Sequence, residues 1–207
     1  MENKTQYLED ISQIRSMMER SSRFISLSGL SGVFAGVYAL AGAFLAHQII
    51  NNEIGINYQS KFLNLSSGRL EQLVIIALAV LGLAIGTGII LTTQKARKRG
   101  LKIWDKTAKL LTINLLIPLI TGGILCLIFL HHGLVGVIAP STLIFYGLSL
   151  INASKYTFTD IRYLGFAEIA LGLISAYYVG FGLYFWALGF GILHILYGAI
   201  MYFKYER

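Results

Sequence analysis

Six long apolar runs, separated by short polar segments, dominate this 207-residue chain. The runs lie near residues 25–49, 71–93, 109–130, 133–152, 163–180 and 183–203, and the fifth is the shortest. Each approaches the ~20 residues with which an α-helix crosses ~30 Å of hydrocarbon. They lack the strict alternation of polar and apolar residues that marks a membrane β-barrel. The pattern therefore predicts an all-α fold, a polytopic transmembrane helical bundle with six spans.

A different pattern precedes the first run. Residues 1–23 are amphipathic, with Tyr7, Ile11, Ile14 and Met18 recurring at helical spacing. We expect a cytoplasmic amphipathic helix over 1–23, followed by a six-helix transmembrane domain over 24–207. The helix carries four acidic and four basic residues, so it is not a basic lipid-binding helix. A neutral helix with an apolar stripe is suited to packing on protein, either the second loop of this chain or a separate cytoplasmic partner.

Composition and charge support a membrane location and give an orientation. Only 13% of residues are charged, whereas soluble domains carry about 25%. Of the 17 basic residues, 15 lie in the N-terminal segment, the second and fourth loops and the C-terminal tail, which six spans place on one side of the membrane. The other two, Lys61 and Arg69, lie in the first loop, on the opposite side. The positive-inside rule then predicts that both termini are cytoplasmic. The net charge of +7 is explained by this asymmetry, and we expect a lipid bilayer, not nucleic acid, as the surrounding partner.

One carboxylate and one imidazole stand out within the runs. Glu168 lies about six residues into the fifth run, and His194 lies near the middle of the sixth. An ionisable group inside a membrane is costly and is a candidate functional site. The two helices should be neighbours, because only a short turn joins them, and the two side chains should lie at similar depth. A structural polar clasp between helices is the simpler interpretation, and a proton relay or gate is the alternative.

A second candidate site is a kink in the third run. Asn114, Pro118 and Thr121 lie close to one helix face. Pro118 cannot donate to the carbonyl of Asn114, so it should bend the helix. Carbonyls freed near a kink can line an ion site, but a purely structural kink is the simpler expectation.

Other chemistry is not indicated. The chain has no Gly-rich phosphate loop, CxxC pair, HExxH or GxSxG motif. His47, His131 and His132 have no carboxylate or cysteine at a recognised metal-ligand spacing. We therefore expect no metal, no cofactor and no enzymatic activity.

Small residues recur at spacings of four. They include Ser28, Gly32 and Gly36 in the first run and Gly82 and Gly86 in the second. Such stripes let helices approach closely. They are expected to pack within the chain, with a homo-oligomer interface as the alternative.

Residues 10–32, DISQIRSMMERSSRFISLSGLSG, resemble the opening of an uncharacterised family of small six-span inner-membrane proteins of bacteroidete-type bacteria. Beyond this segment the resemblance is limited to the six runs and the basic second loop. It implies a bacterial cytoplasmic-membrane location. The family supplies no activity, so no functional residue is carried over.

The sequence thus leaves two functions open. The first is a non-enzymatic sensor, regulator or assembly factor that acts through its cytoplasmic face, and it rests on the neutral N-terminal helix and the basic second loop. The alternative is a small transporter or channel with a polar site at Glu168 and His194.

Overall fold

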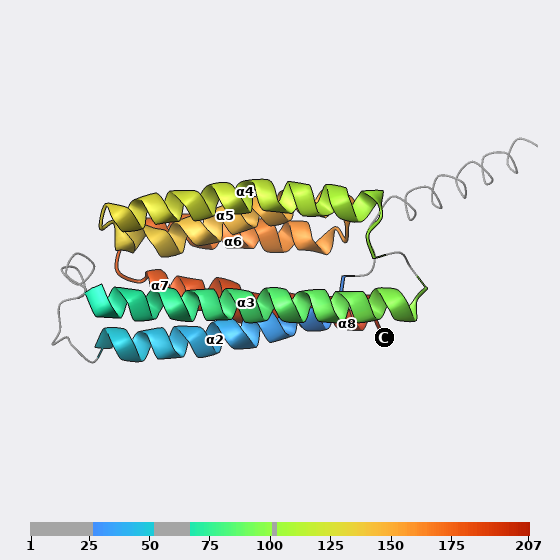
Figure 1. Ribbon diagram of the computed structural model, residues 1–207, viewed down its shortest axis with the longest axis horizontal. Helices are drawn as coiled ribbons and strands as arrows, with labels where there is room; N and C mark the ends of the chain where they lie inside the picture. Colours follow the sequence, from blue (N-terminus) through green and yellow to red (C-terminus); the bar gives the residue numbers. More distant parts are fainter. Residues whose placement is uncertain (1–26, 52–66, 101–102) are drawn as a thin grey trace, which may run out of the picture.

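The computed structural model describes residues 27–51, 67–100 and 103–207, which are helical with no strand among them (Figure 1). The elements are α2 (Gly29–Asn51), α3 (Ser67–Lys98), α4 (Lys106–His131), η2 (Val135–Val137), α5 (Ile138–Ala153), η3 (Ser154–Tyr156), α6 (Asp160–Tyr177), α7 (Gly182–Trp186), η4 (Ala187–Leu193) and α8 (His194–Tyr205). The last three form one rod, in which η4 is a π-helical segment. The predicted amphipathic helix over 1–23 lies outside the described residues.

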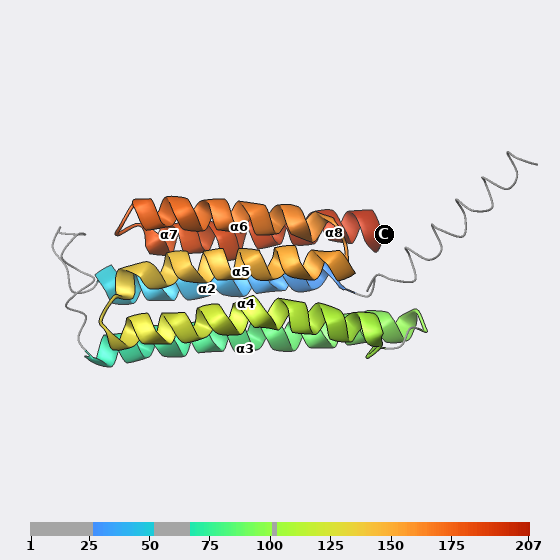
Figure 2. The same ribbon diagram turned by 90° about the horizontal axis from the view of Figure 1, so that it is seen from above.

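The helices form two layers. One layer contains α4, α5 and α6, and the other contains α2, α3 and the rod of α7, η4 and α8 (Figures 1 and 2). In each layer a central helix packs on two others: α5 on α4 and α6, and α2 on α3 and α8. The layers meet mainly where α5 and α6 contact the rod. The junction of the layers is therefore built largely from the sixth apolar run.

Five helical segments are long and apolar enough to cross a membrane: Gly29–Ile50, Gly68–Lys98, Lys106–His131, Val135–Tyr156 and Gly182–Tyr205. They support a polytopic membrane protein. The helix of the fifth predicted span, α6, is not among them. It has 18 residues and includes Asp160, Arg162 and Glu168. It nevertheless runs alongside the other long helices in the bundle (Figure 2).

Glycines bring the helices of each layer together. A Cβ added at Gly36 of α2 would lie 2.6 Å from the carbonyl oxygen of Gly191 in η4, and one added at Gly32 would lie 3.2 Å from the Cα of Gly198. The first-run stripe therefore packs within the chain. At Gly82 and Gly86 of α3, by contrast, an added Cβ would meet nothing within 4 Å. The stripe of α3 thus faces away from the described part of the bundle.

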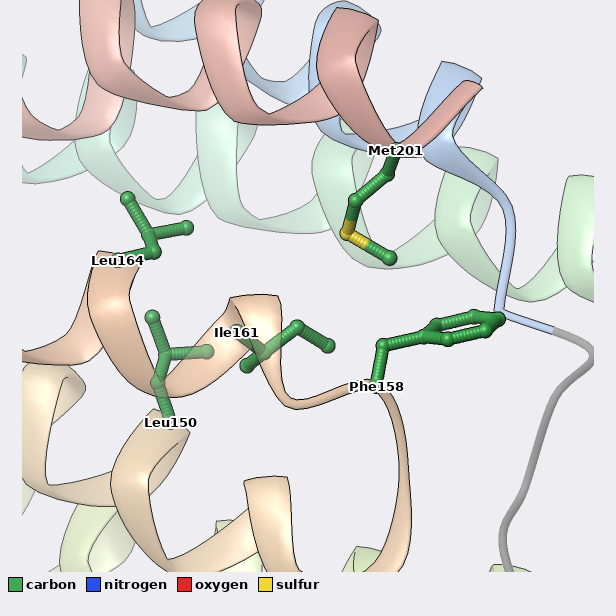
Figure 3. Close-up of a cluster of buried hydrophobic side chains, with 5 residues drawn as sticks. All are labelled: Leu150, Phe158, Ile161, Leu164 and Met201. Atoms are coloured by element: carbon green, nitrogen blue, oxygen red, sulfur yellow. The ribbon is translucent and has the colours of Figure 1, made fainter. Parts of the chain in front are cut away.

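One end of the layer junction is filled by an apolar cluster. It consists of Leu150, Phe158, Ile161, Leu164 and Met201 (Figure 3). These residues come from α5, the segment before α6, α6 itself and α8. The cluster lies between the middle of the bundle and the end that carries Asp160 and Lys204, which the charge asymmetry predicts to be cytoplasmic.

Candidate functional site

Glu168 lies at the junction of the two layers, and its side chain is 0% exposed. It projects from α6 onto the backbone of Gly189 in η4, where an added Cβ would collide with the Glu168 Oε2 and with Leu143. Glycine at 189 is therefore the residue that leaves room for the carboxylate. A buried ionisable group at such a position demands a chemical explanation.

His194 is an ionisable neighbour of Glu168. Its Nδ1 lies 3.4 Å from Glu168 Oε1 and 3.0 Å from the carbonyl oxygen of Gly189. Its Nε2 lies 2.8 Å from the Tyr146 hydroxyl. A carbonyl only accepts, so Nδ1 carries a proton and donates to Gly189. In the neutral ring Nε2 then accepts from the Tyr146 hydroxyl, so both nitrogens are fixed by their partners.

The site has members from three separate stretches of the chain. Tyr146 comes from α5, Glu168 from α6, and His194 begins α8 directly after the π-helical segment. π-Helical segments are rare and occur often at functional sites. Here the segment supplies the Gly189 carbonyl that holds the imidazole. The polar contact thus links the α4–α6 layer to the rod of the other layer.

Neither carboxylate oxygen of Glu168 has a hydrogen-bond partner among the described residues, and the same is true of the Ser175 hydroxyl. An ionised carboxylate without donors in an apolar interior is strongly unfavourable. Two arrangements avoid an isolated charge: a neutral acid beside a neutral imidazole, or a carboxylate beside an imidazolium. They have the same net charge and differ only in the position of one proton. The geometry favours the neutral acid beside the neutral imidazole, because Nδ1, the nitrogen that faces Glu168, already carries the proton that it donates to Gly189.

Aromatic rings cover the imidazole. Phe190 stacks on His194 with ring centroids 5.7 Å apart, and it also contacts Tyr146 at 5.0 Å and Trp186 at 5.1 Å. These rings shield His194 from the surroundings, which leaves it 7% exposed. Shielding strengthens every electrostatic contact within the site, because the local dielectric constant is low.

A second polar network lies at the opposite end of the bundle from the α6–α7 turn. The Glu206 carboxylate accepts hydrogen bonds from the Gly29 N–H and from Ser28 Oγ, and its Oε1 lies 3.1 Å from Lys95 Nζ. Lys95 also donates to the Leu27 carbonyl at 2.6 Å. An acid at a helix N-terminus is favourable because it pairs with free N–H groups and the helix dipole. This network ties α8 and α3 to the start of α2.

Asp160 joins the layers at the same end. Its carboxylate accepts from Lys204 Nζ at 3.0 Å and from the Tyr205 hydroxyl at 2.6 Å. Burial alone would raise the pKa of Asp160, but the hydrogen bonds from Tyr205 and Lys204 outweigh it, so this pKa lies below its usual range.

The predicted kink residues lie apart from this site. Pro118 lies inside α4, which continues as one helix past it. Asn114 donates to the Leu110 carbonyl at 2.8 Å, and Thr121 donates to the Ile117 carbonyl at 2.8 Å. Both side chains therefore bond within their own helix and do not join Glu168 or His194.

Sequence reasoning picked out Glu168 and His194 but missed three contributors. Tyr146 was detectable as a hydroxyl in the middle of an apolar run, while Gly189 and Ser175 carry no signal apart from their places on helices whose contacts were unknown. Within the described ranges, no three His, Cys, Asp or Glu side chains gather as a metal site would require. Comparison with protein-family models, curated proteins and solved structures finds no match to this chain.

Proposed function

We propose that this protein is a small proton-coupled transporter that binds and releases its proton at the Glu168–His194 pair. The observation that carries the proposal is the Glu168 carboxylate, which is fully buried, has no hydrogen-bond donor among the described residues, and lies 3.4 Å from an imidazole. Intramembrane carboxylates and histidines are common components of proton relays.

The position of the pair supports a role in conformational change. Glu168 and Tyr146 belong to one layer, and His194 belongs to the other. A change in protonation would alter the attraction across the junction, because one side would gain or lose a charge. In many transporters two halves move relative to each other around a site at their interface. The two layers described here provide such halves.

The proposal includes a six-span topology in a bacterial cytoplasmic membrane, with both termini inside. The helix α6 lies among helices long enough to span, although it is shorter and more charged than they are. The distribution of basic residues supports the orientation. The charged Asp160 and Arg162 lie at one end of α6, where they reach the predicted cytoplasmic boundary.

Infrared difference spectroscopy of the reconstituted protein during a pH titration tests proton binding. We expect a carboxylic-acid C=O band that disappears in Glu168→Gln and persists in Glu71→Gln, whose exposed carboxyl lies near the start of α3. In proteoliposomes with an imposed pH gradient, Glu168→Gln should also abolish proton movement, which a lumenal pH dye reports. A titrating band and proton movement that both survive in Glu168→Gln would refute the proposal.

The second polar network, around Glu206 and Lys95, supports a second candidate function. In this function the protein is a regulator or assembly factor that binds a cytoplasmic protein or a second copy of this chain. Glu206 and Lys95 hold the point where the N-terminal segment joins α2. A partner bound to residues 1–23 would therefore act on a junction that contacts α3 and α8. Affinity capture with the full chain and with a 1–23 deletion tests this function. Identical sets of captured proteins would rule it out.

A further inference from the structure

Two buried polar groups that have no hydrogen-bond partner in the described part of the chain lie on one face of α6. Glu168 and Ser175 are seven residues apart, which is two helical turns and about 10 Å along the axis. Glu168 is 0% and Ser175 is 2% exposed, and both are without hydrogen bonds among the described residues. A serine within a helix ordinarily donates to the carbonyl four residues earlier, as Ser149 does to Phe145 at 2.9 Å. The bare hydroxyl of Ser175 is therefore an exception.

Two glycines of the rod face these two groups. Gly189 lies against the Glu168 carboxylate, and an added Cβ at Gly182 would lie 3.9 Å from Ser175 Oγ. Gly182 and Gly189 are also seven residues apart. We call these four residues the polar seam. It runs from the α6–α7 turn to the middle of the bundle, with side chains on α6 and bare backbone opposite.

The other direction along α6 is apolar. Toward Asp160, the helix buries Leu164 and Ile161 against Leu150, Met201 and Phe158 (Figure 3). Buried polar atoms without protein partners are the usual positions of internal water, whereas a cluster of this kind stays dry. Glu168 thus has polar neighbours on one side along the axis and hydrocarbon on the other.

We propose that the polar seam admits water from the outer end of the bundle. In this conformation, Glu168 therefore exchanges its proton with the outer side and not with the cytoplasmic side. The inference rests on the proton-binding function proposed above and adds the direction of access. A proton from outer water passes along water held at Ser175 to the Glu168 carboxylate, which becomes the neutral acid. The titratable groups that face Glu168 from the packed elements are His194 of α8 and Tyr146 of α5. The segment η4 contains no titratable side chain, and Tyr184 of α7 packs against His47 instead.

Cysteine labelling tests the direction of access. Ser175→Cys and Ser149→Cys are placed separately in a Cys126→Ser background, since Cys126 is the single native thiol. Both positions are buried, with Ser149 0% and Ser175 2% exposed. Ser149 differs in its place, because it lies on α5 between Glu168 and the cytoplasmic end, next to Leu150 of the apolar cluster. A thiol in a wet site ionises and reacts, while one in an apolar site is inert. The probe is a small, charged, membrane-impermeant methanethiosulfonate.

We expect the probe, added from the outer side, to label Ser175→Cys about tenfold or more faster than Ser149→Cys. Added from the cytoplasmic side, it should label neither. Adding Gly182→Val, which fills the seam beside Ser175, should slow the outer labelling by a similar factor while the protein remains folded by circular dichroism. Equal rates at the two positions, cytoplasmic labelling of Ser175→Cys, or no labelling from either side would overturn the inference. Loss of proton binding in Glu168→Gln does not depend on these rates, so the two proposals can fail separately.

Discussion

Gly147 of α5 and Gly165 of α6 are in close contact, so that the backbone of each lies where a side chain on the other would be. A Cβ added at Gly147 would lie 2.6 Å from the Gly165 carbonyl oxygen, and one added at Gly165 would lie 2.7 Å from the Gly147 carbonyl oxygen. This reciprocal contact sets the distance between α5 and α6 one turn away from Glu168. It thereby holds Tyr146 and Glu168 at the depth of His194.

Gly165→Ala should therefore separate α5 from α6 and destabilise the protein. Overpacking a tight interface costs about 1–3 kcal/mol. The matched control is Gly123→Ala in α4, where an added Cβ meets nothing within 4 Å. Thermal unfolding in detergent should show a lower midpoint for the first variant alone. Equal midpoints would mean that the glycine contact does not determine the spacing.

Tyr146→Phe should change the environment of His194 Nε2, while Nδ1 keeps the proton that it donates to the Gly189 carbonyl. The hydroxyl that donates to Nε2 is lost, while the ring and its packing remain. Nitrogen-15 NMR of labelled histidine should show the Nδ1–H tautomer in both proteins, with the Nε2 resonance shifted in the variant because Nε2 loses its hydrogen-bond donor. Tyr38→Phe, which removes a hydroxyl in contact with Thr87, is the control and should leave the His194 signals unchanged. An unchanged spectrum in Tyr146→Phe would contradict the assigned hydrogen bond.

Glu206→Gln should loosen the start of α2. The variant keeps the shape of the side chain but loses the charge that pairs with Lys95 and favours the helix N-terminus. Hydrogen bonds to charged groups contribute about 1.5–3 kcal/mol, so we expect a clear fall in the unfolding midpoint. Glu71→Gln, at an exposed position of α3, should have little effect. Hydrogen exchange at the Gly29 amide is the direct measurement, and protection as strong as in the native protein would argue against the contact.

Stability should decline in acid through Asp160. The folded state holds the pKa of this carboxyl below its usual range, because Tyr205 and Lys204 hydrogen-bond to the ionised form despite burial. The stabilisation is therefore complete above the usual aspartate pKa and disappears as pH falls through the lowered value of the folded state. The unfolding midpoints of the native protein and Asp160→Asn should differ near neutral pH and converge in acid. A difference that does not change with pH would show that the carboxylate charge is irrelevant.

Hydropathy located most of the helices, because the position of a membrane-crossing run depends on local composition alone. The sequence also placed Glu168 and His194 at similar depth, which followed from helix geometry and the short turn between α6 and α7. For the predicted kink residues, the sequence left a structural kink and an ion site open. Asn114 and Thr121 share a helix with Pro118, but their side chains bond to that same helix, and no sequence pattern distinguishes this from a shared site.

The lateral arrangement could not be predicted in the same way. Apolar residues face either lipid or other helices with little difference in composition. The sequence therefore does not indicate that α2 packs on α8, or that Gly82 and Gly86 face outward while Gly32 and Gly36 face inward. The π-helical segment is likewise hidden, since Ala187–Leu193 has the same small and apolar residues as its neighbours. Tyr146 and Gly189 join the site only through these packing choices.

The pairing of α2 with α8 also has a consequence for biosynthesis. These helices belong to one layer, but the entire α4–α6 layer lies between them in the sequence. When α2 enters the membrane, the glycine face that will receive α8 has no partner, and the Glu206 that will bind the Gly29 amide has not been translated. The first span must therefore persist as an incomplete element, solvated by lipid, until a complete layer has been inserted beside it. Among the described helices, assembly is therefore completed by a contact between elements far apart in the sequence, and a ribosome that stalls before α8 leaves a product in which α2 still lacks this partner.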